Sequence, residues 1–101
     1  MILRARRFIA DNYASPEMTL KSAADYVGLN EKYFSTKFTK ETGMTFSTYL
    51  TSVRLEKAKR LMESTDLRMY EISDRVGYHN VEHFNRMFKK AYGTSPGDYK
   101  R

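Results

Sequence analysis

Apolar residues recur at three- and four-residue steps along most of the chain, and no segment alternates apolar and polar residues as a half-buried strand does. Only two prolines and five glycines interrupt these steps. The pattern therefore predicts an all-α protein of about seven helices. The expected helical segments run from about Ala5 to Tyr13, Leu20 to Val27, Asn30 to Gly43, Thr45 to Ser64, Leu67 to Val76 and Asn80 to Tyr92, followed by a last turn that opens at Ser95 and Pro96.

Capping signals mark several helix ends. Thr19, Asn30 and Thr45 each precede an apolar run and are expected to accept backbone N–H hydrogen bonds at helix starts. Gly43 is expected to end a helix in the left-handed conformation, and the residue before Pro16 disfavours continuing one. The residues expected on the apolar faces are Ala5, Phe8, Ile9, Tyr13, Leu20, Ala23, Ala24, Val27, Phe34, Phe38, Phe46, Tyr49, Leu50, Val53, Ala58, Leu61, Met62, Phe84, Met87, Phe88 and Ala91.

The chain contains the same unit twice. The segment VGLNEKYFSTKFTKETGMTFSTY aligns with VGYHNVEHFNRMFKKAYGTSPGDY once a single residue is inserted in the turn. The matched pairs are Gly28 with Gly77, Phe34 with Phe84, Phe38 with Phe88, Lys40 with Lys90, Gly43 with Gly93, Thr45 with Ser95 and Tyr49 with Tyr99.

Each unit has the order of a helix-turn-helix: a short helix, a tight glycine turn and a second helix. The expected organisation is one DNA-binding domain over residues 1–101, with a first unit at about 1–43, a linker helix at about 45–64 and a second unit at about 66–101. A generic helical hairpin fits a single unit equally well. Two copies in a basic chain favour DNA binding.

Charge supports a polyanionic partner. Eighteen Lys and Arg against 12 Asp and Glu give a formal net charge of +6 at pH 7. The absence of cysteine excludes disulfides, thiol catalysis and thiolate metal sites, and fits a cytoplasmic setting. No signal peptide or membrane span is expected, because no long apolar run occurs.

The second helix of each unit carries the candidate DNA-reading residues. With its two phenylalanines facing inward, the first copy has Lys32, Ser35, Thr36 and Thr39 on its other side, and the second has Glu82, His83, Arg86 and Lys90. Arginine suits guanine and glutamate suits the cytosine amino group, so these residue types match base edges. The residues suited to phosphates are Lys37, Lys40, Arg54, Lys89 and Lys90.

The residues now support a family resemblance. The stretches VGLNEKYFSTKFTKETG, YLTSVRLEKAKRLM and ISDRVGYHNVEHFNRMFKKAYGTSPGDYKR resemble the C-terminal DNA-binding domain of AraC/XylS-family transcription regulators over nearly the entire chain. The stretch VGYHNVEHFNRMFKK is most similar to output domains of YesN-type response regulators. Ser73, where the family commonly has alanine, and Lys100, where it often has arginine, are departures.

The resemblance implies sequence-specific binding of a double-stranded promoter operator. The linker helix, roughly 27–30 Å long at 1.5 Å per residue, is expected to let the two recognition helices enter adjacent major-groove segments. The resemblance places Lys32, Ser35, Thr36, Glu82, His83 and Arg86 at positions where family members touch bases. It also implies that the chain is the output half of a bacterial regulator with a further sensing or receiver domain. The isolated domain is expected to be a monomer without cofactor.

One motif indicates a different class of function, a zinc peptidase. His79, Glu82 and His83 match H-x-x-E-H, a zinc-peptidase signature, but no glutamate follows His83 to supply a third ligand. Asn80 is the expected helix cap, which leaves His79 in the turn, pointing away from His83. We therefore expect neither a metal site nor an enzyme. The alternative from another class is a helical protein-interaction module with an incidental basic surface.

Overall fold

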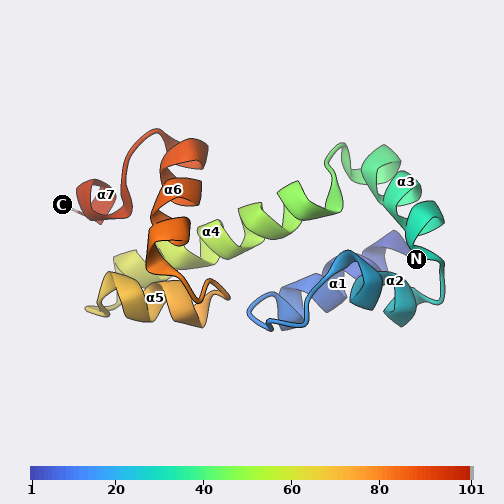
Figure 1. Ribbon diagram of the computed structural model, residues 1–101, viewed down its shortest axis with the longest axis horizontal. Helices are drawn as coiled ribbons and strands as arrows, with labels where there is room; N and C mark the ends of the chain where they lie inside the picture. Colours follow the sequence, from blue (N-terminus) through green and yellow to red (C-terminus); the bar gives the residue numbers. More distant parts are fainter. Residues whose placement is uncertain (101) are drawn as a thin grey trace. The chain divides into compact units, whose positions relative to one another are not determined.

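The computed structural model describes residues 1–100, and within them it contains seven α-helices and no strand (Figure 1). This confirms the all-α prediction. The helices are α1 (Ile2–Asn12), α2 (Leu20–Val27), α3 (Glu31–Thr42), α4 (Phe46–Ser64), α5 (Met69–Arg75), α6 (Val81–Tyr92) and α7 (Pro96–Lys100).

The helices form two compact units, one covering Met1–Thr51 and one beginning at Ser52. In the first, α1 packs on α2 and α3, and α2 packs on α3. In the second, α6 packs on α5 and α7. Residues of α4 belong to both units, since the boundary falls inside this helix.

Aromatic side chains build the core of each unit. In the first, Phe34 and Phe38 are fully buried, and the rings of Phe46 and Tyr49 pack edge-on against Phe38 at centroid distances of 5.7 and 5.2 Å. In the second, Phe84 and Phe88 are fully buried, and Tyr99 packs against Phe88 at 5.6 Å. The Phe38–Tyr49 and Phe88–Tyr99 contacts are the same contact in the two copies.

The helix ends repeat as well. Asn30 Oδ1 accepts the N–H of Tyr33 at the start of α3, and Asn80 Oδ1 accepts the N–H of His83 at the start of α6. Gly43 and Gly93, both with a φ of 77°, end these helices in the left-handed region. The repeat predicted from the sequence is therefore a structural repeat.

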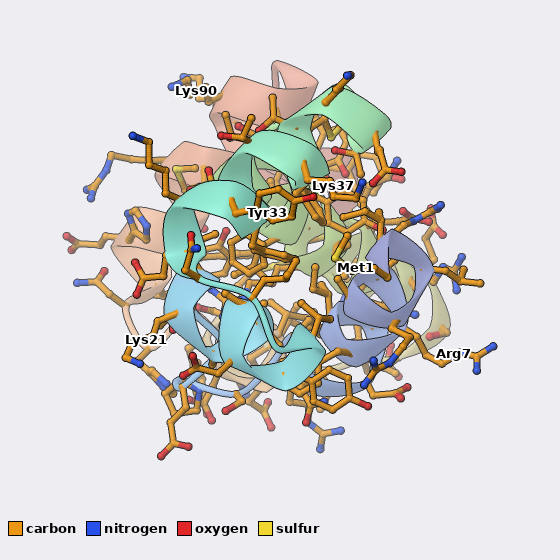
Figure 2. All side chains as sticks on the ribbon, turned by 90° about the vertical axis from the view of Figure 1, so that its right-hand side faces the viewer. Met1, Arg7, Lys21, Tyr33, Lys37 and Lys90 are labelled. Atoms are coloured by element: carbon orange, nitrogen blue, oxygen red, sulfur yellow. The ribbon has the colours of Figure 1, made fainter. Side chains whose placement is uncertain are left out.

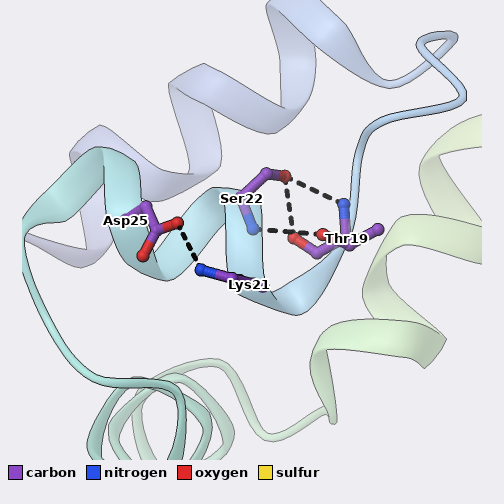
Figure 3. Close-up of polar contacts among 4 residues, drawn as sticks. All are labelled: Thr19, Lys21, Ser22 and Asp25. Atoms are coloured by element: carbon purple, nitrogen blue, oxygen red, sulfur yellow. Dashed lines mark hydrogen bonds and ion pairs between the residues drawn. The ribbon is translucent and has the colours of Figure 1, made fainter.

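At the start of α2, Thr19 and Ser22 form a capping box (Figure 3). Thr19 Oγ1 accepts the N–H of Ser22 at 3.1 Å, and Ser22 Oγ accepts the N–H of Thr19 at 2.9 Å. One turn on, Lys21 pairs with Asp25 at 3.1 Å. The capping box confirms Thr19 as the cap of α2, the helix that precedes α3.

The turn of the second unit contains a side-chain hydrogen bond that the first unit cannot form. The N–H of Leu29 donates to Ala24 O at 3.0 Å, and the N–H of Tyr78 donates to Ser73 O at 2.9 Å. Ser73, 1% exposed, additionally donates its hydroxyl to Tyr78 O at 2.7 Å. Ser73, which stands where the resemblance leads one to expect alanine, therefore stabilises the turn before α6.

Several details of the helix predictions were wrong. The first helix begins at Ile2 rather than at about Ala5. The fifth helix begins at Met69 rather than Leu67, because Glu71 Oε1 accepts the N–H of Arg68 and makes that residue the cap. Ala91 is exposed rather than on the apolar face of α6. Leu55, absent from the expected apolar face, is fully buried.

Candidate nucleic-acid interface

The exposed side of α3 is set by the two phenylalanines on its other side. With Phe34 and Phe38 fully buried, Lys32, Thr36 and Lys40 are exposed at four-residue steps and form one row along the helix. Figure 2 shows Tyr33 and Lys37 on the same helix, while Arg7 and Lys21 extend into solvent from α1 and α2. The row combines two ammonium groups with a hydroxyl, all able to donate hydrogen bonds.

The matching row on α6 is Glu82, Arg86 and Lys90, again exposed at four-residue steps. His83 and Lys89 are exposed beside it. Buried Phe84 and Phe88 hold the other side of the helix in the core. The second row adds a carboxylate and a guanidinium, so its chemistry differs from that of the first row.

Ser35 and Lys37 depart from the outward placement expected of them. Both are half-buried, and Ser35 lines a hollow with Met18, Leu20 and Leu50 inside the first unit. Of the candidates on α3, Lys32, Thr36 and Lys40 therefore form the exposed row, and Thr39 is exposed beside it.

The structure adds a residue to the exposed surface of α3. Tyr33 is 53% exposed and occupies the position that His83 occupies on α6. The sequence contained this signal, because Tyr33 and His83 align in the repeat. A large aromatic residue beside the polar row offers an apolar surface to a thymine methyl group.

Arg54 does not extend freely from α4. It is half-buried, and its guanidinium carbon lies 5.6 Å from the centroid of the Tyr78 ring. Burial lowers the pKa of Arg54 from its usual value, and the neighbouring Tyr78 partly offsets this effect. The side chain predicted to contact phosphate is thus engaged within the second unit.

Charges that favour the helix dipole lie at both ends of α3 and α6, although Glu41 in the last turn of α3 opposes it. Each carries a glutamate in its first turn, Glu31 on α3 and Glu82 on α6. Lys40 lies in the last turn of α3, and Lys89 and Lys90 lie in the last turn of α6. The basic residues toward the C-terminal ends suit phosphates that flank a groove.

The histidines are held apart by separate contacts. His79 Nδ1 lies 3.1 Å from Asp74 Oδ1, whereas the His83 ring packs on Tyr78. Among residues 1–100, no group of three or more His, Asp or Glu side chains is placed to bind a metal ion. The H-x-x-E-H match is therefore divided between a turn and a helix.

Comparison with known proteins agrees with this geometry. A helix-turn-helix domain family matches residues 23–101. The C-terminal domain of AraT, a response regulator from Geobacillus stearothermophilus, superposes with a TM-score of 0.96 at 39% identity, covering 99% of this chain and 83% of that one. The chain belongs to the AraC-type helix-turn-helix family.

Two curated relatives of this AraC-type domain are longer transcription regulators. The regulatory protein YesN of Bacillus subtilis is 38% identical over 104 residues, which cover all of this chain and 28% of that protein. The xylose operon regulatory protein of Escherichia coli K12 is 33% identical over 99 residues, covering 98% of this chain and 25% of that protein. The chain thus spans between a quarter and a third of the length of these two relatives.

Family membership makes this chain a DNA-binding domain of the transcription-regulator class rather than an enzyme. No helix of the AraC-type domain within residues 1–100 combines the length and apolar character needed to cross a membrane.

Proposed function

We propose that this AraC-type domain binds one specific double-stranded operator in a bacterial promoter, using α3 and α6 as recognition helices in adjacent major-groove segments. The observation that supports this most is the repeated row of exposed polar side chains at 32, 36, 40 and at 82, 86, 90. In both units a buried phenylalanine pair fixes the rotation of the helix, so the row has a defined direction. Helix-turn-helix domains read bases with this kind of surface.

Residue roles follow from chemistry and exposure. The proposed base contacts are Lys32, Ser35, Thr36, Glu82, His83 and Arg86, and the proposed phosphate contacts are Lys37, Lys40, Lys89 and Lys90. Half-buried Ser35 is the weakest of the base contacts, and exposed Tyr33 is a further one. Arg54, which lies over the Tyr78 ring, is not among the proposed phosphate contacts.

The two rows predict an asymmetric operator. On α3, Lys32 and Thr36 present hydrogen-bond donors to the bases. On α6, Glu82 presents an acceptor and Arg86 presents a donor. Different side chains select different bases, so a monomer that uses both helices reads two unlike half-sites. We further propose that the domain acts in the cytoplasm as a monomeric output module joined to a sensing or receiver domain; AraT, the similar structure, is a response regulator.

Selection from a randomised duplex library tests this function. Repeated enrichment on the purified domain at moderate salt is expected to yield one non-palindromic motif with two conserved blocks. A library that stays random after several rounds would contradict sequence-specific binding and favour the protein-interaction alternative.

Substituting alanine for Arg86 is expected to weaken operator binding by about 1–3 kcal/mol and to relax the preference at one base pair, since the guanidinium matches the acceptors of guanine. Alanine at Lys89 is expected to weaken all sequences alike and to reduce the slope of log affinity against log salt by about 0.9. Fluorescence anisotropy on the operator and its single-base variants measures both. If the two variants behave alike, Arg86 contacts phosphate and its assignment to a base is wrong.

A further inference from the structure

Three side chains from separate elements contact one another in sequence at the start of α6. Arg54 of α4 lies over the ring of Tyr78 at 5.6 Å, within the range of a cation–π contact. The Tyr78 ring meets the His83 ring at a centroid distance of 5.5 Å and an interplanar angle of 62°, an edge-on contact. We call these three residues the Arg54–Tyr78–His83 stack.

Tyr78, the middle member, is held firmly. The residue is 7% exposed, and its ring also packs against that of Phe84 at a centroid distance of 5.8 Å. Its backbone exchanges two hydrogen bonds with buried Ser73, one through the main chain and one through the hydroxyl. His83, by contrast, is exposed on the side of α6 that carries Arg86.

This arrangement is confined to the second unit. In the first unit Leu29 stands in the turn where the second has Tyr78, and Ala24 stands where the second has Ser73. Tyr33, the counterpart of His83, therefore has no aromatic turn residue behind it. The extra contacts distinguish the two recognition helices.

We infer that the Arg54–Tyr78–His83 stack positions His83 for base recognition, with Arg54 and Tyr78 acting through His83 rather than on DNA. An exposed side chain loses rotamer freedom when it binds, and a side chain already ordered by a fixed neighbour loses less. The Tyr78 ring limits the orientations of the imidazole, and the Arg54 guanidinium covers the face of that ring. This inference rests on the proposed function.

The test separates a positioning role for Arg54 from a phosphate contact. Arg54→Met removes the guanidinium but keeps an apolar chain over Tyr78. Arg60→Met is the matched control, because Arg60 is an exposed residue of the same helix that pairs with Glu56 at 3.3 Å. His83→Ala identifies the base pair that His83 reads. Affinities for all single-base variants of the selected operator are measured at several salt concentrations.

We expect Arg54→Met to lose preference at the same base pair as His83→Ala, by about fivefold, the lower end of what a base contact contributes. The slope of log affinity against log salt for Arg54→Met is expected to equal that of the native domain. The double variant Arg54→Met/His83→Ala is expected to lose no more preference at this base pair than His83→Ala alone. Arg60→Met should leave the preference at that base pair intact. Tyr78→Phe, which keeps the ring, should also preserve it, whereas Tyr78→Leu should abolish it if circular dichroism shows the variant folded.

A uniform loss with Arg54→Met, accompanied by a salt slope smaller by about 0.9, would identify a phosphate contact and overturn the inference. An Arg54→Met domain that keeps the full preference would overturn it equally, as would a His83→Ala domain with unchanged preferences. The proposed function fails separately: it is contradicted only if the native domain shows no base preference at any position.

Discussion

Replacing Phe88 by alanine is expected to lower the free energy of unfolding by about 3–5 kcal/mol, the usual cost of truncating a fully buried phenylalanine. Phe88 is 0% exposed, and its ring lies against those of Phe84, Tyr92 and Tyr99 at centroid distances of 6.0, 4.7 and 5.6 Å. Alanine leaves a cavity among these rings. The same ring fixes the rotation of α6, so operator binding should fall together with stability.

Urea unfolding followed by circular dichroism measures the effect. Tyr70→Ala is the matched control, because it truncates a large aromatic residue that is 62% exposed. Exposed truncations of this kind usually change stability by less than about 0.5 kcal/mol. A loss below about 1 kcal/mol for Phe88→Ala would show that the second unit does not depend on this ring.

Inserting five base pairs between the two half-sites of the operator is expected to reduce affinity to that of one half-site alone. The insertion turns one half-site about half a helical turn away from the other. The segment Phe46–Ser64 is one helix of 19 residues, about 28 Å long at 1.5 Å per residue, close to the ~34 Å between successive major-groove faces. Specific binding exceeds non-specific binding by about 4–10 kcal/mol, so losing one half-site costs several kcal/mol.

Footprinting and anisotropy on spacer variants check this expectation. A ten-base-pair insertion returns both half-sites to the same face of the duplex but leaves them farther apart. We expect the domain to bind this duplex as weakly as the one with five inserted base pairs. Five base pairs added outside the half-sites should leave affinity unchanged. Undiminished binding after the internal insertion would mean that only one unit reads DNA.

The sequence predicted the repeated parts of the fold well because their signals are local. Asn30 and Gly43 mark the ends of α3, and Asn80 and Gly93 mark the ends of α6 through the same chemistry. The core residue Leu55 was missed because α4 contributes to two cores. The apolar stripe of Phe46 and Leu50 belongs to the first unit, and a second stripe, Leu55, Ala58 and Met62, begins in the second unit.

The candidate site was predictable where exposure follows from helical spacing alone, as for Lys32, Thr36 and Arg86. It was less predictable where another element covers a residue. Ser35 faces a hollow lined by Met18 and Leu50, which are distant in the sequence. Arg54 stacks on Tyr78, 24 positions along the chain, and neither residue alone indicates the contact.

Binding of the selected operator in competition with unrelated duplex DNA, at about 0.15 M salt, tests the central claim most directly. Sequence-specific recognition predicts that the operator complex survives a large excess of competitor, with an affinity ratio of at least about 10³. It also predicts a steep fall in both affinities as salt rises, because Lys and Arg side chains displace condensed counterions. Equal affinity for the operator and a scrambled duplex of the same composition would contradict sequence-specific binding by this domain.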